Sequence, residues 1–228
     1  MIVYPKNWQD FGKPVTFEQI DNVMKKTIAS IDCANLSFSG GLDSSLLLHY
    51  ILETKGHAHC FTVANDIEHP DIEYSNKSIK WFEDKYRIHI NHSVFIRQKL
   101  EGDMLVKSFY NILKTFVNCI IAGDCIDELS CGYYQHQDLS ETTYQDYLNR
   151  LQAEHLVPLN ENSGDIKVYL PYADNRIANL LYRVPLYEKV STTCRKTVMM
   201  KLAEGKVNLE AIERKKYGFA TSISVKTR

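Results

Sequence analysis

Seven consecutive residues have the composition of a phosphate-binding turn: Ser39-Gly40-Gly41-Leu42-Asp43-Ser44-Ser45. Apolar residues around Leu36 predict a short buried strand before the turn, and residues 42–54 have helical character after it. Such a turn places backbone N–H groups at the positive end of a helix, where phosphate oxygens bind. Asp43 has the wrong charge to contact phosphate directly, which indicates Mg²⁺ between the two. The alternative is an ordinary Ser/Gly turn capped by Asp43.

Bulk composition limits the classes of protein that fit. With 228 residues, 44% of them hydrophobic, the chain can form one large domain or two small ones. A net charge of −1 gives no electrostatic argument for nucleic acid or an anionic membrane as a partner. No apolar run is long enough for a membrane span. Six cysteines without CxxC spacing favour free thiols in a reducing cytoplasm, and the histidines show no metal-ligand spacing.

Strands alternate with helices along the first half of the chain. Beyond the strand and helix that flank the turn, we expect strands at 58–64, 88–95 and 118–123 and helices at 17–31, 71–86 and 104–117. This alternation predicts an α/β fold with a parallel twisted sheet and right-handed crossovers. Ligands bind beyond the carboxyl ends of such strands, where both the turn and the segment after Ile121 fall.

The second half is less regular, and we expect it to form a helical lobe. The sequence predicts helices at 142–155, 175–182 and 191–204, a polar loop at 159–165 and a short extended piece at 168–172. No change in composition marks a linker, so we expect a single domain over residues 1–228. Its parts are an N-terminal helical segment to about residue 32, a nucleotide-binding core at 33–135 and a lobe at 136–228 that completes the active site.

Four segments carry a family resemblance. The turn resembles the pyrophosphate-binding loop (PP-loop) of ATP pyrophosphatases, whose pattern is Ser-Gly-Gly-x-Asp-Ser. Segments 122–133, 170–176 and 214–219 are similar to three motifs of asparagine synthetases, and Lys196 lies twenty residues before Lys216, where that family also has a lysine. Together they resemble the synthetase domain of the asparagine synthetase superfamily, which includes β-lactam and carbapenam synthetases and lasso-peptide cyclases. The resemblance implies a fold of the adenine nucleotide α-hydrolase-like (PP-loop) type.

The same resemblance implies an ATP-dependent ligase that forms an amide bond. A carboxylate substrate would attack the α-phosphate of ATP to give an acyl-adenylate and pyrophosphate, and ammonia or an amine would then attack the acyl carbon. The residues that would hold ATP or pyrophosphate are Ser39, Gly40, Gly41, Leu42, Asp43, Ser44, Ser45, Gly123 and Lys196. Asp43 and Asp127 would hold Mg²⁺ on the phosphates. Alternatively, Asp127 is a helix N-cap.

Three further residues are candidates for catalysis. Lys216 would stabilise developing charge, although the basic run 214–216 could also be solvated surface. Asp124 occupies the position of a candidate acid/base in the family, with a structural carboxylate as the alternative. Glu161, in the expected polar loop, could partner Asp124.

Several positions depart from the family pattern. Cys125 replaces a glycine and Ser130-Cys131 replace Phe-Gly, which makes that loop bulkier. Residue 2 is Ile rather than the nucleophilic Cys of a glutaminase domain, so we expect no such domain. The nitrogen would then come from free ammonia, a separate amidotransferase subunit, or an amine substrate, and the carboxylate would be a small molecule or a peptide. A homo-oligomer is compatible with these features.

Two other functions fit part of the sequence. A tRNA-modifying PP-loop enzyme would carry a basic RNA-binding extension or paired cysteines, and neither is evident. A non-catalytic nucleotide-binding or regulatory module would have lost Asp43, Asp127 or Lys216, and all three are present.

The role of Lys216 is testable against its neighbour. Lys216→Ala should leave ATP binding nearly intact and lower turnover by roughly 10²–10³, because a preorganised charged donor is lost at the transition state. Lys216→Arg should not restore the rate fully, since a planar fork places its charge differently. Lys215→Ala is the control and should change little in steady-state assays. Equal, small losses at both positions would mean that the basic run is only surface.

Overall fold

Five parallel strands form one sheet in a computed structural model of the chain, which describes residues 14–214. The strands are β1 (Asn35–Ser37), β2 (His59–Ala64), β3 (Asn91–Ile96), β4 (Cys119–Ile121) and β5 (Lys167–Tyr169). Their order is β3-β2-β1-β4-β5, and every neighbouring pair is parallel. The prediction of an α/β fold with a parallel sheet is therefore confirmed.

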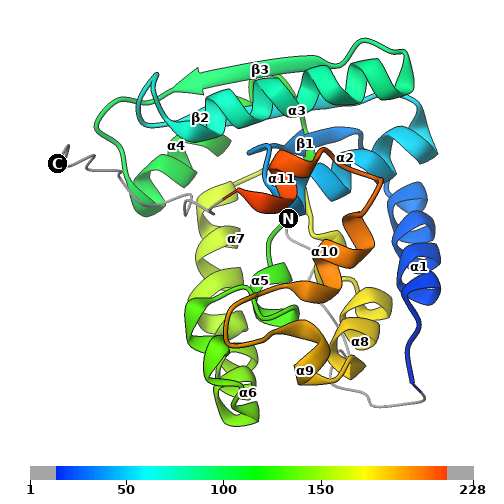
Figure 1. Ribbon diagram of the computed structural model, residues 1–228. Helices are drawn as coiled ribbons and strands as arrows, with labels where there is room; N and C mark the ends of the chain where they lie inside the picture. The colour runs from blue at the N-terminus through cyan, green and yellow to red at the C-terminus, as the bar shows by residue number, and fades with distance from the viewer. Residues whose placement is uncertain (1–13, 215–228) are drawn as a thin grey trace, which may run out of the picture.

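Helices cover this sheet and form a lobe beyond it. Those of the first half are α1 (Phe17–Ser30), α2 (Leu42–Lys55), α3 (Pro70–Tyr86), α4 (Gly102–Leu113) and α5 (Ile126–Leu129). Those of the second half are η1 (Tyr134–Asp138), α6 (Glu141–Arg150), η2 (Leu151–Leu156), α7 (Val157–Ser163), η3 (Pro171–Ala173), α8 (Asn175–Arg183), α9 (Leu186–Lys189), α10 (Thr197–Ala203) and α11 (Leu209–Glu213). In Figure 1 the helices α6, α8 and α9 lie at the opposite end of the molecule from β3.

The strand order creates a crevice between β1 and β4. From β1 the chain moves outward through β2 to β3, and then returns to the other side of β1 to form β4. Leu36 of β1 pairs with Ile121 of β4, so the segments after these strands leave the sheet at the same edge. In open α/β sheets this reversal point is where ligands bind.

Helix α2 follows β1 and occupies the centre of the molecule. Every residue from Ser44 to Leu52 is buried, and the helix contacts α1, α3, α10 and α11. A helix that is buried on all sides needs apolar residues all round, and the Leu-rich sequence 46–52 supplies them apart from His49, which hydrogen-bonds to the Tyr86 hydroxyl at 2.6 Å. The turn at its start is therefore held on a rigid, central element.

Three predictions for the second half need correction. Residues 159–163 are not a polar loop but belong to α7, because Leu156, Leu159 and Ser163 share a buried helical face and a proline is tolerated in the first turn. The expected helix 191–204 begins only at Thr197. The Ser191 hydroxyl accepts hydrogen bonds from the backbone N–H groups of residues 193 and 194, a local turn that competes with helix formation.

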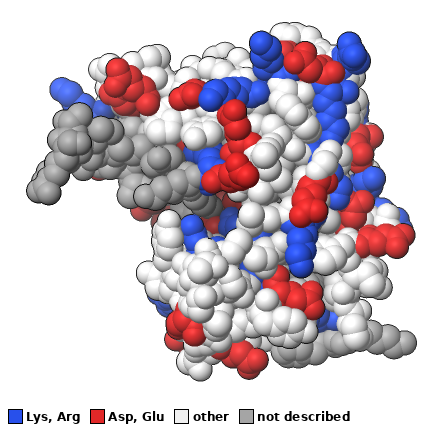
Figure 2. All heavy atoms as spheres, in the orientation of Figure 1, with Lys and Arg blue, Asp and Glu red and all other residues white. Residues whose placement is uncertain are grey.

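The third correction concerns the extended piece at 168–172. Its first part is β5, a full member of the sheet that pairs with β4, whereas Pro171 and the two residues after it form the short helix η3. No helix within residues 14–214 is long and apolar enough to cross a membrane. Lys and Arg side chains are interspersed with Asp and Glu over the upper part of the face drawn in Figure 2.

Candidate active site

The turn after β1 lies directly on the backbone of α3. Gly40 has a φ of 69°, and a Cβ added there would lie 2.4 Å from the carbonyl carbon of Tyr74 and 2.5 Å from the nitrogen of Ser75. Glycine is therefore required at this position both for its conformation and for the close contact. Gly123, at the end of β4, differs: an added Cβ would only make ordinary contacts of 3.7 Å or more.

The serines of the turn bond to one another and to the start of α2. The hydroxyls of Ser39 and Ser44 lie 3.2 Å apart, and Ser39 also accepts a hydrogen bond of 3.3 Å from the N–H of Gly41. Ser44 in turn donates to the carbonyl of Gly41. These hydroxyls line the pocket described below, and an anion could replace them as partners of the helix N-terminus. Ser45 is fully buried and does not line that pocket.

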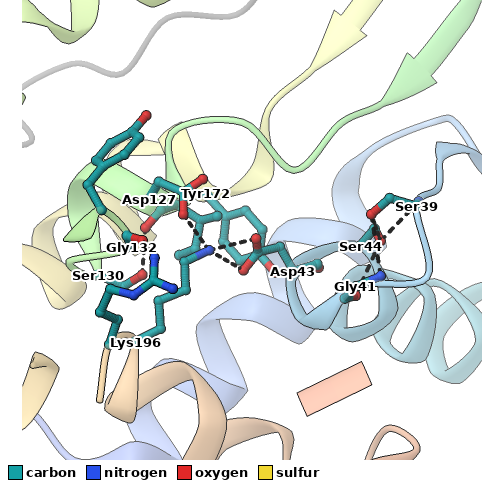
Figure 3. A network of polar contacts seen from close by, with 12 residues as sticks. Ser39, Gly41, Asp43, Ser44, Asp127, Ser130, Gly132, Tyr172 and Lys196 are labelled. Atoms are coloured by element: carbon teal, nitrogen blue, oxygen red, sulfur yellow. Dashed lines mark hydrogen bonds and ion pairs between the residues drawn. The ribbon is translucent and has the colours of Figure 1, made fainter. Parts of the chain in front are cut away.

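Lys196 joins two carboxylates that come from different strand ends. Its ammonium lies 2.6 Å from Asp43 Oδ2, at the start of α2, and 2.7 Å from Asp127 Oδ1, on α5 after β4. Figure 3 shows the Lys196 side chain reaching between the two acids. All three side chains are at least four-fifths buried. A lysine predicted to contact phosphate thus lies where the sequence predicts a metal ion.

Asp43, Lys196 and Asp127 form an ion cluster, and close packing around it fixes the positions of their side chains. A Cβ at Gly132 would overlap Asp127 Oδ1 and lie 2.5 Å from the Cε of Lys196, so no other residue fits there. The buried Tyr172 donates a hydrogen bond of 2.9 Å to the backbone carbonyl of Asp43. Cys125 and Cys131, on either side of Asp127 in the chain, have φ values of 73° and 62°. Their backbone keeps the left-handed conformation that glycine adopts easily.

The ion cluster has the donor set that Mg²⁺ needs in a nucleotide site. Two carboxylates converge on one atom, the Lys196 nitrogen, from the two sides of the β1/β4 crevice. Mg²⁺ is commonly held by one or two carboxylates together with substrate phosphates rather than by an all-protein cage. No group of three or more His, Cys, Asp or Glu suited to a metal occurs within residues 14–214. Asp43 and Asp127 therefore fit a metal that arrives with phosphates.

Asp124 has a partner that the sequence did not indicate. His155 Nε2 lies 2.9 Å from Asp124 Oδ1, and this hydrogen bond raises the pKa of His155 to about 9. His155 is therefore a cation at neutral pH, and its second N–H, on Nδ1, has no hydrogen-bond partner among the described residues. It lies on η2, a π-helical segment between α6 and α7, and such segments are frequent at functional sites. Glu161, the partner expected for Asp124, is exposed on α7 and does not line the pocket.

A pocket of about 460 Å³ connects these groups. Ser39, Ser44 and Asp43 line it on the side of β1, Asp124 and Asp127 on the side of β4. Next to the turn its wall is apolar and aromatic, formed by Phe38, Phe61 and Val63. His155 and the start of α7 close the far side.

Arg214 fastens the end of the described chain to the turn. Its guanidinium donates to the carbonyl of Ser39 at 2.7 Å and to Asp71 at 2.5 Å, and lies over the ring of Tyr74 at 4.4 Å. The side chain is 4% exposed. Lys216 and the family residues Gly218 and Phe219 lie outside the described residues.

The predicted site residues thus fall into distinct groups. Those that line the pocket are Ser39, Asp43, Ser44, Gly123, Asp124 and Asp127. Gly40, Gly41, Leu42 and Lys196 support it, whereas Ser45 and Glu161 do not reach it. The sequence does not predict a role for His155, because this residue belongs to no recognisable motif. It also missed the contact of Arg214 with the turn, although Arg214 opens a recognised motif.

Part of the chain matches a known protein family. A sequence model of the asparagine synthase family matches residues 161–228, which are 68 of the 228 residues. The match contains β5, the helices α8 to α11 and Lys196, whereas the turn after β1 lies outside it. No curated protein matches the chain. The C-terminal part of the chain is therefore similar to asparagine synthases.

Removing the cation between the two acids should make the protein depend on metal. Lys196→Met should destabilise the fold by on the order of 3 kcal/mol, because it leaves two mostly buried carboxylates facing each other. Mg²⁺ should then raise the melting temperature of this variant more than that of the wild type. Lys201→Met, on the exposed side of α10, is the matched control for thermal unfolding. An equal Mg²⁺ effect in all three proteins would contradict the metal assignment.

The pairing of Asp124 with His155 predicts a specific pH dependence. The folded pKa of His155, about 9, exceeds its ordinary value of about 6.5. The pair therefore stabilises the fold fully below pH 6.5, and that stability is lost as the pH rises through 9. An NMR titration should give a His155 pKa near 9 in the wild type and a clearly lower value in Asp124→Asn. The same value in both proteins would show that Asp124 is not the cause.

Proposed function

We propose that this protein is an ATP-dependent ligase that adenylates a carboxylate and transfers the acyl group to an amine. The observation that carries the proposal is the Asp43–Lys196–Asp127 cluster, which lies at the β1/β4 crevice beside a glycine turn and a helix start. Lys196 belongs to the segment that matches the asparagine synthase family. The cluster thus joins a nucleotide-type turn to the family-like part of the chain.

ATP would lie along the pocket from the turn toward α5. Phosphate oxygens would replace the serine hydroxyls as partners of the α2 N-terminus, and Lys196 would turn from the carboxylates to the phosphates. The aromatic wall beside the turn offers Phe38 and Phe61 as an apolar surface for the adenine ring. Asp43 and Asp127 would hold Mg²⁺, which neutralises phosphate charge and orients the pyrophosphate leaving group.

The carboxylate substrate would meet a positive charge on the far side of the pocket. His155 is the one cationic group among the described lining residues, because Asp124 keeps it protonated. Its Nδ1–H is available to bind the carboxylate and to orient it toward the α-phosphate. This gives Asp124 a positioning role, instead of direct proton transfer to substrate. The carboxylate forms a bond to the α-phosphorus as pyrophosphate leaves, and the amine then displaces AMP with loss of a proton.

The reaction products distinguish this mechanism from other ATP-dependent ligations. With Mg·ATP labelled on the α-phosphate and a competent carboxylate, the label should appear in AMP, and labelled pyrophosphate should exchange into ATP. Asp43→Asn and Asp127→Asn should each weaken Mg·ATP binding by roughly tenfold or more, because an anionic metal ligand is lost. Glu73→Gln, an exposed change on α3, should leave it unchanged. Formation of ADP and phosphate would exclude the proposed reaction.

A further inference from the structure

The pocket wall carries a strong excess of negative charge. Among the described residues that line it, seven are Asp or Glu, one is His and none is Lys or Arg. ATP and a carboxylate substrate are both anions, so this wall repels them wherever its charge is not balanced.

Most of the acids have a positive or polar partner within the chain. The cationic partners are Lys196 for Asp43 and Asp127, Arg214 for Asp71, His155 for Asp124 and Arg150 for Glu154. Asp103 is exposed and accepts a hydrogen bond of 3.2 Å from Asn162. Asp103 and Glu128 thus lack a cationic partner among the described residues, and of these two acids only Glu128 is buried.

Glu128 is also the acid that most needs a partner. The residue is 4% exposed, and its Oε1 accepts a hydrogen bond of 2.7 Å from the hydroxyl of Tyr133. Its Oε2 is buried and has no hydrogen-bond partner among the described residues. Burying a carboxylate oxygen without a partner is unfavourable unless a ligand supplies one. Glu128 lines the pocket, so a ligand there can do so.

The surroundings of Glu128 suit an organic cation better than a small inorganic one. The Tyr133 ring stacks on Tyr147 with 4.6 Å between centroids, and Phe109, Tyr110 and Tyr133 line the pocket. Aromatic faces attract organic ammonium groups and also contact their apolar chains.

We infer that the amine substrate is an organic primary amine, bound as its ammonium ion by Glu128 and the aromatic wall around Tyr133. The inference rests on the proposed function, since it names the second substrate of that reaction. Glu128, Asp43 and Asp127 all line this pocket, so the ammonium binds in the same pocket as the two aspartates of the ion cluster. Glu128 and His155 line the same pocket, and the charge of Glu128 helps to raise the pKa of His155, so the ammonium and the carboxylate bind within one pocket.

Binding can be measured without ATP, with butylammonium as the probe. Saturation-transfer NMR at pH 7 should show binding to the wild type, little binding of the neutral isostere 1-butanol, and little competition from ammonium chloride. Glu128→Gln keeps an acceptor for Tyr133 but loses the charge, and it should weaken butylammonium binding by about tenfold or more. Glu154→Gln removes a charge from the same pocket wall at an exposed position and is the control.

Several outcomes would overturn the inference. They are equal binding of 1-butanol and butylammonium to the wild type, unchanged binding in Glu128→Gln, or full displacement by ammonium chloride. Loss of Mg²⁺ binding in Glu128→Gln without loss of butylammonium binding would make Glu128 a metal ligand instead. Because butylammonium, 1-butanol and ammonium chloride are compared on the wild-type protein, this part of the test does not depend on whether a variant folds. Mg·ATP binding and pyrophosphate exchange are measured separately, so their failure would refute the ligase function without affecting the butylammonium result.

Discussion

The contact of one lysine with two aspartates holds the site together. Asp43 and Lys196 are 153 residues apart in the chain, and Asp127 lies between them in sequence. Each comes from a different element: the start of α2, α5 and the turn before α10. Because none of the three can move without leaving a mostly buried charge unpaired, the cluster fixes the helical lobe against the carboxyl edge of the sheet. Two carboxylates and one ammonium give these three side chains together a net charge of −1.

Backbone strain concentrates around this cluster. Six non-glycine residues within residues 14–214 have a positive φ, and three of them belong to this region: Lys196 itself and Cys125 and Cys131 on either side of Asp127. A left-handed conformation costs about 1–2 kcal/mol for a residue with a Cβ. Such strain persists only where the surrounding structure imposes it, and it is frequent at functional sites. The π-helical segment that carries His155 is a second irregularity on the same pocket.

The sequence predicts those features that depend on local patterns. Alternating strands and helices predict the parallel sheet, and the rule that parallel strands end at one edge predicts that Asp43 and Asp127 lie close together. The interaction of Lys196 with both acids depends on long-range packing, which spacing along the chain does not encode. The sequence does not predict β5 as a strand of the sheet, because its three residues are too few for a periodic pattern. His155 belongs to no sequence motif, and its position depends on a π-helical turn that the local sequence pattern does not predict. Residues 159–165 predict a loop because their polar composition hides the buried face that α7 forms with Leu156.

Arg214 has a practical consequence for any experiment that alters the end of the chain. Its guanidinium is the only described group that ties α11 to the carbonyl of Ser39, and it also neutralises the buried Asp71. A truncation or proteolytic cut that removes this residue would release the glycine turn from one side and leave a buried carboxylate unpaired. Lost activity in a shortened chain would then report a displaced turn as well as any missing functional group. Point substitutions, which leave Arg214 in place, are therefore the safer way to assign roles near this terminus.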